Sequence, residues 1–146
     1  MRIFLSGAIE GVGDLANGWR NEVIRQLDRR NGDSLTELHG YDIVTPLINA
    51  EQQVFHTTNE IVRRNEMLQK SCDMILVEYN IPGRCYVGTD YELVRALDWN
   101  QPAIVWAHES YRERVYLQYL ATAILPTLQE AINYITAYYP PNMRSE

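Results

Sequence analysis

Residues 74–106 read MILVEYNIPGRCYVGTDYELVRALDWNQPAIVW, and this stretch decides the fold. Its two ends, 74–77 and 103–106, are short apolar runs of the kind that form buried strands. Between them, a proline and a glycine mark a loop, and apolar residues at helical spacing follow Gly88. A strand, a helix and a strand in this order form a βαβ unit with parallel strands. The predicted elements are a strand over 73–79, a loop over 80–88, a helix over 89–99 and a strand over 102–107.

The rest of the chain continues this alternation. The further predicted elements are a strand over 3–6 that ends at Gly7, a helix over 14–30, a strand over 41–44, a helix from Thr57 or Thr58 to 71, a short strand near 119–124 and a helix over 127–138. Five parallel strands predict a flavodoxin-like (Rossmann-like) α/β fold with strand order 2-1-3-4-5 and helices on both faces. No linker or internal repeat is visible, so we expect one domain over 1–146 with a loose tail at 139–146.

The composition limits the classes of partner. Of the 146 residues, 46% are hydrophobic and 22% are charged, as in globular domains with a substantial core. The net charge is -6, with only 13 Lys and Arg and no basic run, so no nucleic-acid polymer is expected as a partner. No apolar run reaches membrane-spanning length, and no signal-peptide pattern is visible. We therefore expect no membrane partner and a cytoplasmic location with reduced thiols.

Metal and cofactor patterns are absent from the sequence. His39, His56 and His108 are scattered, and Cys72 and Cys85 lack the spacing of metal ligands. The glycines after the first predicted strand do not complete a dinucleotide-binding pattern, and no phosphate-binding GxxxxGK[ST] run occurs. We expect neither a metal nor an organic cofactor.

The predicted strand order places a crevice outside the carboxyl ends of strands 1 and 3, where open α/β sheets bind ligands. The turn at Gly7 would face the loop before Glu92 across this crevice. Glu92 then has two interpretations, which the sequence leaves open. Thr89-x-x-Glu92 has the spacing of a capping box, in which the glutamate folds back onto the helix start. A carboxylate at the mouth of a crevice can instead act as a nucleophile.

Three segments together resemble the nucleoside 2-deoxyribosyltransferase family and its relatives, the nucleotide N-glycoside hydrolases. They are Phe4-Leu5-Ser6-Gly7, then Ile61-Val62-Arg63-Arg64-Asn65-Glu66-Met67-Leu68 with Cys72-Asp73-Met74-Ile75-Leu76-Val77, and Gly88-Thr89-x-x-Glu92 followed by Ala96. The resemblance covers roughly residues 2–107. It implies a flavodoxin-like domain that cleaves the bond between a nucleobase and a ribose or deoxyribose.

The family resemblance also implies roles for residues. Glu92 would attack C1′ of the sugar and form a glycosyl-enzyme ester, which a second base or water then resolves. Asn65 stands where many relatives carry an aspartate that helps to protonate the leaving base, so Asn65 is the second predicted catalytic residue. The residues expected to bind substrate are Phe4, Ser6, Gly7, Ala8, Arg84, Tyr86, Gly88, Thr89 and Asp90.

Three positions depart from the family pattern. Asn65 can form hydrogen bonds but cannot supply a proton as an aspartic acid can. Relatives often carry tyrosine where Phe4 stands, and aspartate or serine where Tyr86 stands. Arg84 could bind a 5′-phosphate. The sequence therefore leaves open whether the substrate is a nucleoside or a nucleotide. It also leaves open whether the sugar is transferred to another base or to water.

Two further expectations complete the sequence-based picture. Relatives are homo-oligomers whose neighbouring subunit helps to close the site, and tyrosines crowd the final third of this chain, so we predict a homodimer or larger with part of 108–139 at the contact. The alternative function is a non-catalytic nucleotide-binding module on the same fold, with Glu92 kept as a cap and Asn65 marking lost acid chemistry.

Overall fold

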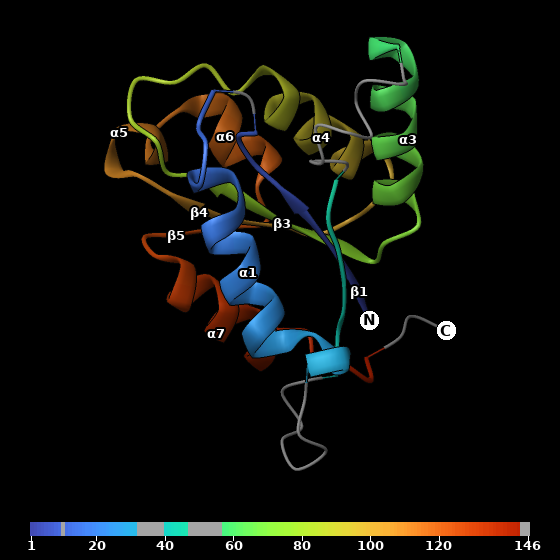
Figure 1. Cartoon of the computed structure of the whole chain (residues 1–146). Coiled ribbons are helices and arrows are strands. Elements are labelled where there is room, and N and C mark those ends of the chain that lie inside the picture. Colours follow the sequence, from blue (N-terminus) through green and yellow to red (C-terminus); the bar gives the residue numbers. More distant parts are fainter. Residues whose placement is uncertain (10, 32–39, 47–56, 144–146) are drawn as a thin grey trace.

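The five strands of a parallel sheet run side by side through the centre of the molecule (Figure 1). The computed structural model describes residues 1–9, 11–31, 40–46 and 57–143. The spatial order is β2-β1-β3-β4-β5, and every neighbouring pair is parallel, as predicted. The strands are β1 (Arg2–Ser6), β2 (Asp42–Val44), β3 (Met74–Tyr79), β4 (Ala103–Ala107) and β5 (Ala123–Leu125).

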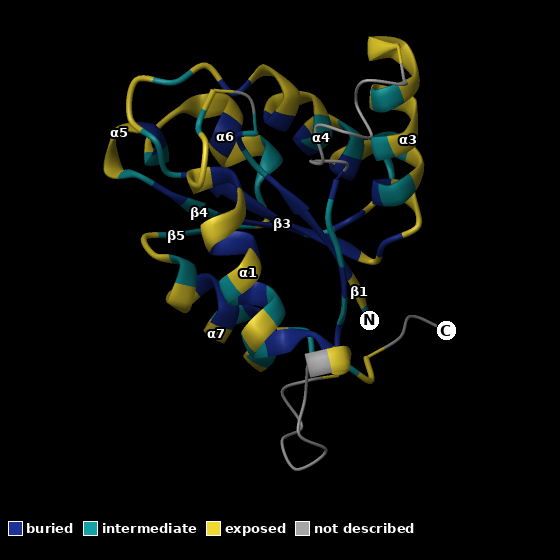
Figure 2. Cartoon of the chain, in the orientation of Figure 1, coloured by how far each residue is buried: buried dark blue, intermediate teal, exposed yellow. Residues whose placement is uncertain are grey.

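The inner strands are buried on both faces, which is why they appear in the sequence as continuous apolar runs. All six residues of β3 are buried. Side chains alternate between the faces, so Ile3 and Leu5 of β1 enter one hydrophobic cluster and Phe4 enters the other. Figure 2 shows the buried strands between helices whose outer surfaces are exposed.

One face of the sheet is covered by α1 (Leu15–Leu27) and α7 (Leu128–Tyr138). Apolar residues spaced three or four apart point inward from α1, namely Trp19, Val23 and Leu27. Thr127 is the N-cap residue of α7, because its Oγ1 atom accepts a hydrogen bond from Glu130 N at 3.1 Å.

The other face is covered by α3 (Thr58–Lys70), α4 (Val87–Asp98), and the short helices α5 (Glu109–Arg112) and α6 (Val115–Leu120). Leu93 and Ala96 of α4 and Leu117 of α6 are buried in the cluster on this face. Thr57, rather than Thr58, caps α3 by accepting a hydrogen bond from Glu60 N at 3.2 Å.

The predicted elements are confirmed in type and order, with differences at boundaries. The fifth strand is Ala123–Leu125, not 119–124, because 115–120 forms α6 and buries Leu117. The first helix ends at Leu27, and a single 3₁₀ turn, η1 (Arg29–Asn31), follows it. The helix α4 begins at Val87, two residues before the predicted start, with consequences for Glu92.

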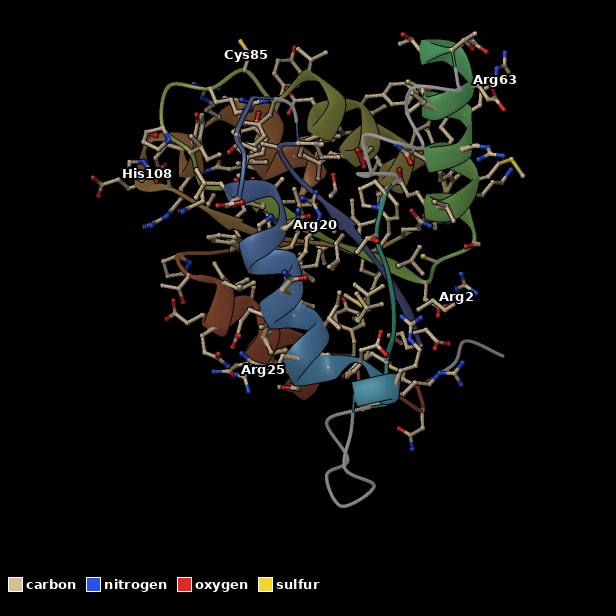
Figure 3. The ribbon with its side chains drawn as sticks, in the orientation of Figure 1. Arg2, Arg20, Arg25, Arg63, Cys85 and His108 are labelled. Atoms are coloured by element: carbon tan, nitrogen blue, oxygen red, sulfur yellow. The ribbon has the colours of Figure 1, made fainter. Side chains whose placement is uncertain are left out.

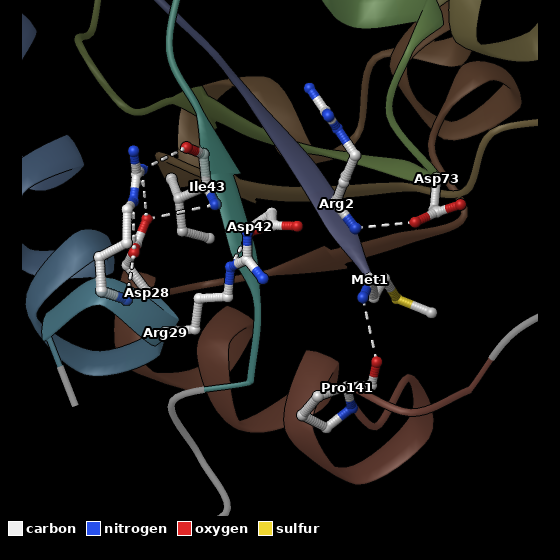
Figure 4. A network of polar contacts seen from close by, with 9 residues as sticks. Met1, Arg2, Asp28, Arg29, Asp42, Ile43, Asp73 and Pro141 are labelled. Atoms are coloured by element: carbon white, nitrogen blue, oxygen red, sulfur yellow. Dashed lines mark hydrogen bonds and ion pairs between the residues drawn. The ribbon is translucent and has the colours of Figure 1, made fainter. Parts of the chain in front are cut away.

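The edge of the sheet at the amino ends of the strands is closed by polar contacts (Figure 4). Asp28 Oδ2 accepts hydrogen bonds from Arg30 at 2.7 Å and from Ile43 N at 3.3 Å. Arg2 N donates to Asp73 Oδ2 at 2.7 Å, and the Met1 ammonium donates to Pro141 O at 3.0 Å.

We expected a loose tail from residue 139, and within it Tyr139, Pro141 and Met143 take part in hydrogen bonds. Tyr41 donates a hydrogen bond from its hydroxyl to Tyr139 O at 2.7 Å. The remaining residues 144–146 lie outside the part that the structure describes. Within the described part, no helix has both the length and the hydrophobicity that crossing a lipid bilayer requires.

Candidate active site

A cavity of about 660 Å³ lies at the carboxyl ends of β1 and β3, where the strand order predicts a ligand site. This volume is within the range of small-molecule sites. Its walls come from the turn after β1, from α3, from the loop before α4 and from the first turns of α4. The described lining residues are Gly7, Ala8, Ile9, Ile61, Val62, Asn65, Glu66, Arg84, Cys85, Tyr86, Val87, Gly88, Thr89, Tyr91 and Glu92.

Glu92 does not cap its helix. Because α4 begins at Val87, Thr89 is the third residue inside it, and the N-cap residue Tyr86 makes no side-chain cap hydrogen bond. The capping-box interpretation of Thr89 and Glu92 is therefore wrong, because Glu92 is the sixth residue of the helix. Gly88 is also helical, and its φ is not positive. Glu92 is left with a side chain that lines the cavity.

The carboxylate of Glu92 is shielded from solvent and has a raised pKa. Its Oε2 atom is shielded from solvent and has no hydrogen-bond partner among the described residues. Burial raises the pKa of Glu92 from its ordinary 4.5 to about 7, while the Ser6 hydroxyl and the Arg20 guanidinium oppose that rise. Among the described residues, Ser6 Oγ has no partner with hydrogen-bond geometry, so its hydroxyl dipole lowers the pKa of Glu92 without a well-formed hydrogen bond. Such a carboxylate titrates near neutrality, as groups at functional sites often do.

Asn65 and Glu92 are fixed relative to each other by a buried contact between their helices. Gln69 lies one turn after Asn65 on the same face of α3. Its side-chain amide donates to Glu92 O at 2.9 Å and to Gln101 Oε1 at 3.2 Å. This contact sets α3 against α4, so Asn65 lines the same cavity as Glu92.

The turn after β1 approaches β3 so closely that position 7 requires glycine. A Cβ atom on Gly7 would lie 2.9 Å from Glu78 Cβ and 3.0 Å from a ring carbon of Trp19. Glu78, at the end of β3, is 3% exposed and accepts a hydrogen bond from Ala8 N at 3.2 Å. Gly7 and Ala8 therefore form one wall of the cavity through their contact with Glu78.

The opposite wall is the loop before α4, and it is also tied to Glu78. Tyr86 donates from its hydroxyl to Glu78 Oε2 at 2.6 Å and accepts from Ile81 N at 2.8 Å. Burial and the hydrogen bond to Glu78 raise the pKa of Tyr86, so it stays a neutral donor. Arg84 N donates to the Tyr111 hydroxyl at 2.9 Å, which holds the loop backbone where the Arg84 side chain lines the cavity.

Solved structures of two named enzyme types share this fold. A 2-deoxyribosyltransferase from Bacillus psychrosaccharolyticus has a TM-score of 0.69 at 15% sequence identity, over 96% of this chain and 96% of that chain. A 2-deoxyribosyltransferase from Leishmania mexicana has 0.67 at 16%, over 94% and 98%. A CMP N-glycosidase from Clostridium botulinum has 0.61 at 14%, over 94% and 99%. No family model and no curated protein matches the sequence.

The chain has the fold of these 2-deoxyribosyltransferases and of the CMP N-glycosidase. At this level the resemblance seen in the sequence is confirmed. At sequence identities of 14–16%, the similarity establishes a shared fold but does not assign roles to individual residues of this chain.

The predicted site residues divide into two groups within this deoxyribosyltransferase-like fold. Eight of them line the cavity, namely Gly7, Ala8, Asn65, Arg84, Tyr86, Gly88, Thr89 and Glu92. The other three are not among its described lining residues. Phe4 is fully buried in the hydrophobic cluster, Ser6 is fully buried beside Glu92, and Asp90 accepts a hydrogen bond from the Tyr79 hydroxyl at 2.8 Å.

Sequence reasoning missed Glu78, Arg20 and Gln69, all of which support the cavity. Two of them carry a signal that could have been read. Glu78 is a charged residue inside an apolar strand run, and Arg20 falls on the helical stripe of Ala16, Val23 and Leu27. A charged side chain at a core position usually has a specific partner or role. Gln69 gives no comparable signal, because a glutamine on a helix is ordinary.

The raised pKa of Glu92 predicts a pH-dependent cost in stability. Its folded-state pKa of about 7 exceeds the ordinary 4.5, so the folded protein binds the proton of Glu92 more tightly than the unfolded chain does. The stability that this proton provides is fully present below pH 4.5 and is lost as the pH rises through 7. Because Glu92→Gln cannot ionise, its free energy of unfolding relative to wild type should increase by about 1–3 kcal/mol between pH 4.5 and pH 8. Urea denaturation at both pH values measures this difference.

The matched control for this experiment is Glu113→Gln, which removes an exposed carboxylate outside the described lining of the cavity. The raised pKa of Glu92 would be contradicted if the free energy of unfolding of Glu92→Gln, relative to wild type, were no greater at pH 8 than at pH 4.5.

Proposed function

We propose that this protein cleaves the N-glycosidic bond of a nucleoside or nucleotide, with Glu92 as the nucleophile. The observation that carries this proposal is the shielded Oε2 of Glu92, which lies in the wall of a cavity of ligand size and has no hydrogen-bond partner among the described residues. The fold supports it, because solved structures with the same fold include 2-deoxyribosyltransferases and a CMP N-glycosidase. The product sugar would pass to a second base or to water.

The chemistry follows from what a carboxylate can do at this place. Glu92 attacks C1′ of the sugar, the bond from C1′ to the base nitrogen breaks, and its electron pair leaves with the base. The negative charge of Glu92 stabilises the oxocarbenium-like transition state, and the resulting ester divides one high barrier into two lower ones. Attack on C1′ by water or by another base then frees the carboxylate. Two displacements retain the configuration at C1′.

The ionisation of Glu92 sets the working pH range of this reaction. Only the ionised carboxylate is a nucleophile, and its pKa of about 7 means that the active fraction rises through neutrality. The leaving base also needs a proton, and Asn65 cannot supply one as an acid. Asn65 in this proposal holds the base or the sugar by hydrogen bonds, and the proton reaches the base from solvent.

A second candidate is a nucleotide-binding module without catalysis. The amide at position 65, in place of a carboxylic acid, favours this alternative. The failure of Glu92 to act as a helix cap counts against it, since the cap would have been the structural reason to keep a glutamate there. Release of a base from any substrate separates the two.

Loss of the nucleophile is the first test. Incubation with a panel of nucleosides and 5′-nucleotides, with and without an added free base, should yield released or exchanged base for the wild type. Glu92→Gln should lower that rate by about 10³-fold or more, because no covalent ester can form. Acid-quenched wild type should carry the added mass of one sugar in a mass spectrum, and Glu92→Gln should not. Base release by the variant at the wild-type rate would reject Glu92 as the nucleophile.

Restoring an acid at position 65 is the second test. Proton donation to a leaving group is worth about 10²–10⁴-fold where a positioned acid provides it. Asn65→Asp should therefore speed base release, most for the poorest leaving groups. The control is Asn59→Asp, which places the same change on an exposed part of α3 outside the described lining of the cavity. If Asn65→Asp is unchanged or slower on every substrate, Asn65 serves specificity and another group delivers the proton.

We further propose a homodimer or larger assembly that uses α6. The apolar side chains of Val115, Tyr116 and Tyr119 are 77%, 81% and 70% exposed on this helix, and exposed aromatic groups of this kind favour interfaces. Sedimentation at micromolar concentration should show a species above the 17.0 kDa chain mass. The double variant Tyr116→Glu, Tyr119→Glu should dissociate it, and a wild type that sediments only as a single chain would contradict the assembly.

A further inference from the structure

Arg20 is a buried cation that forms no direct ion pair with any residue that the structure describes. Its side chain is 1% exposed and lies between α1 and the sheet (Figure 3). The guanidinium donates to Ala16 O and, at 3.3 Å, to Gly7 O, and it lies 4.7 Å from the centre of the Trp19 ring. Among the described residues no carboxylate lies within ion-pair distance of Arg20, and Arg20 Nε has no hydrogen-bond partner. Burying an arginine in this way is costly, so a compensating field or function is expected.

Two carboxylates supply that field, one from Glu92 in the cavity wall and one from the buried Glu78 of β3. Arg20 contacts the carbonyl of Gly7, whose neighbours in space include Glu78, and Gly7 lines the cavity together with Glu92. The charges of Glu92 and Glu78 both favour the protonated guanidinium, while burial lowers the pKa of Arg20 to about 10. Arg20 is therefore still a cation at neutral pH, and the interaction with Glu92 is mutual.

We propose that Arg20 is a positioning residue for the proposed reaction: its buried guanidinium, anchored on the Gly7 carbonyl in the cavity wall, favours the ionised, nucleophilic form of Glu92. This inference rests on the proposed function of Glu92. Glu78 has a different part, because its carboxylate accepts hydrogen bonds from Ala8 N, Asn80 N and the Tyr86 hydroxyl. Those donors stabilise the charge of Glu78, and the positive charge of Arg20 remains effective at Glu92.

Charge balance gives a physical reason for this arrangement. Glu78, Glu92 and Arg20 together carry one net negative charge when all are ionised. That excess is neutralised in the transition state, where the sugar becomes cationic. Once the glycosyl ester forms, Glu92 has no charge and Arg20 faces only Glu78, so the covalent intermediate leaves no unbalanced charge among the three. A fixed cation in this position acts without reorganising during the reaction.

The other charged and titratable groups near Glu92 are accounted for by different contacts. Among the described residues, Glu66 on α3 is bonded to the Tyr91 hydroxyl and lies 3.7 Å from Arg95, and Tyr86 is bonded to Glu78. Asp90 on α4 accepts from Tyr79, a residue of β3. Arg84 and Cys85 line the cavity from the loop. From α1, Arg20 is the charged residue that affects the pKa of Glu92.

The direct test measures the ionisation of Glu92 without any turnover. A carbon-13 NMR titration of the glutamate carboxyl groups follows Glu92, whose signal is identified by its loss in Glu92→Gln. In Arg20→Met the midpoint for Glu92 should rise by about one pH unit or more, whereas Arg20→Lys should stay closer to wild type. Base release by Arg20→Met should fall about tenfold on the acid side of the pH profile and recover toward alkaline pH.

The matched control is Arg25→Met, which removes an exposed cation from the same helix (Figure 3). It should leave the midpoint of Glu92 unchanged. An unchanged midpoint in Arg20→Met overturns the inference, even if Glu92 is the nucleophile. A raised midpoint with no base released from any substrate by the wild type would instead reject the proposed function and leave the charge coupling intact.

Should Arg20→Met fail to fold, Arg20→Gln provides the second test. Its neutral side-chain amide can still donate a hydrogen bond to Gly7 O, so the midpoint for Glu92 should rise because the positive charge is lost. A midpoint that does not rise would overturn the inference.

Discussion

The buried carboxylate of Glu78 is the interaction on which the candidate site depends. It receives three hydrogen bonds, from Ala8 N at 3.2 Å, from Asn80 N at 2.6 Å and from the Tyr86 hydroxyl at 2.6 Å. These donors lie on both walls of the cavity, so one side chain joins the turn after β1 to the loop before α4. The same contact excludes any side chain at Gly7, because a Cβ there would meet Glu78 at 2.9 Å.

The site combines buried charges that a purely structural core would not contain. Glu92 loses hydration without gaining a hydrogen bond on Oε2, and Arg20 is buried without a direct ion pair in the described part of the chain. Each arrangement costs stability, and proteins keep such costs at functional sites. The surrounding sheet offsets them, since the strands and the inner faces of α1, α4 and α7 are closely buried.

Much of the fold could be predicted, because its signals are local in the sequence. Apolar runs of strand length, helical spacing in residues such as Trp19 and Val23, and the cap at Thr127 each act over a few residues. The fifth strand was placed wrongly because the segment 115–125 mixes tyrosine, leucine and alanine without a clear period. In the folded protein, residues 115–120 are helical with Leu117 buried in the hydrophobic cluster, and 123–125 pairs with β4.

The sequence by itself determined the parallel α/β architecture, the strand order and the place of the crevice, because period and alternation follow from backbone geometry. It also brought Glu92 and Asn65 forward as candidates, through the family resemblance. Only the tertiary structure decided that Glu92 is no cap, since this depends on the start of α4 at Val87. Only the tertiary structure placed Arg20 and Glu78 against the turn at Gly7 and Ala8, which lines the same cavity as Glu92. Burial and through-space charge arise between residues far apart in the chain, so no local pattern can encode them.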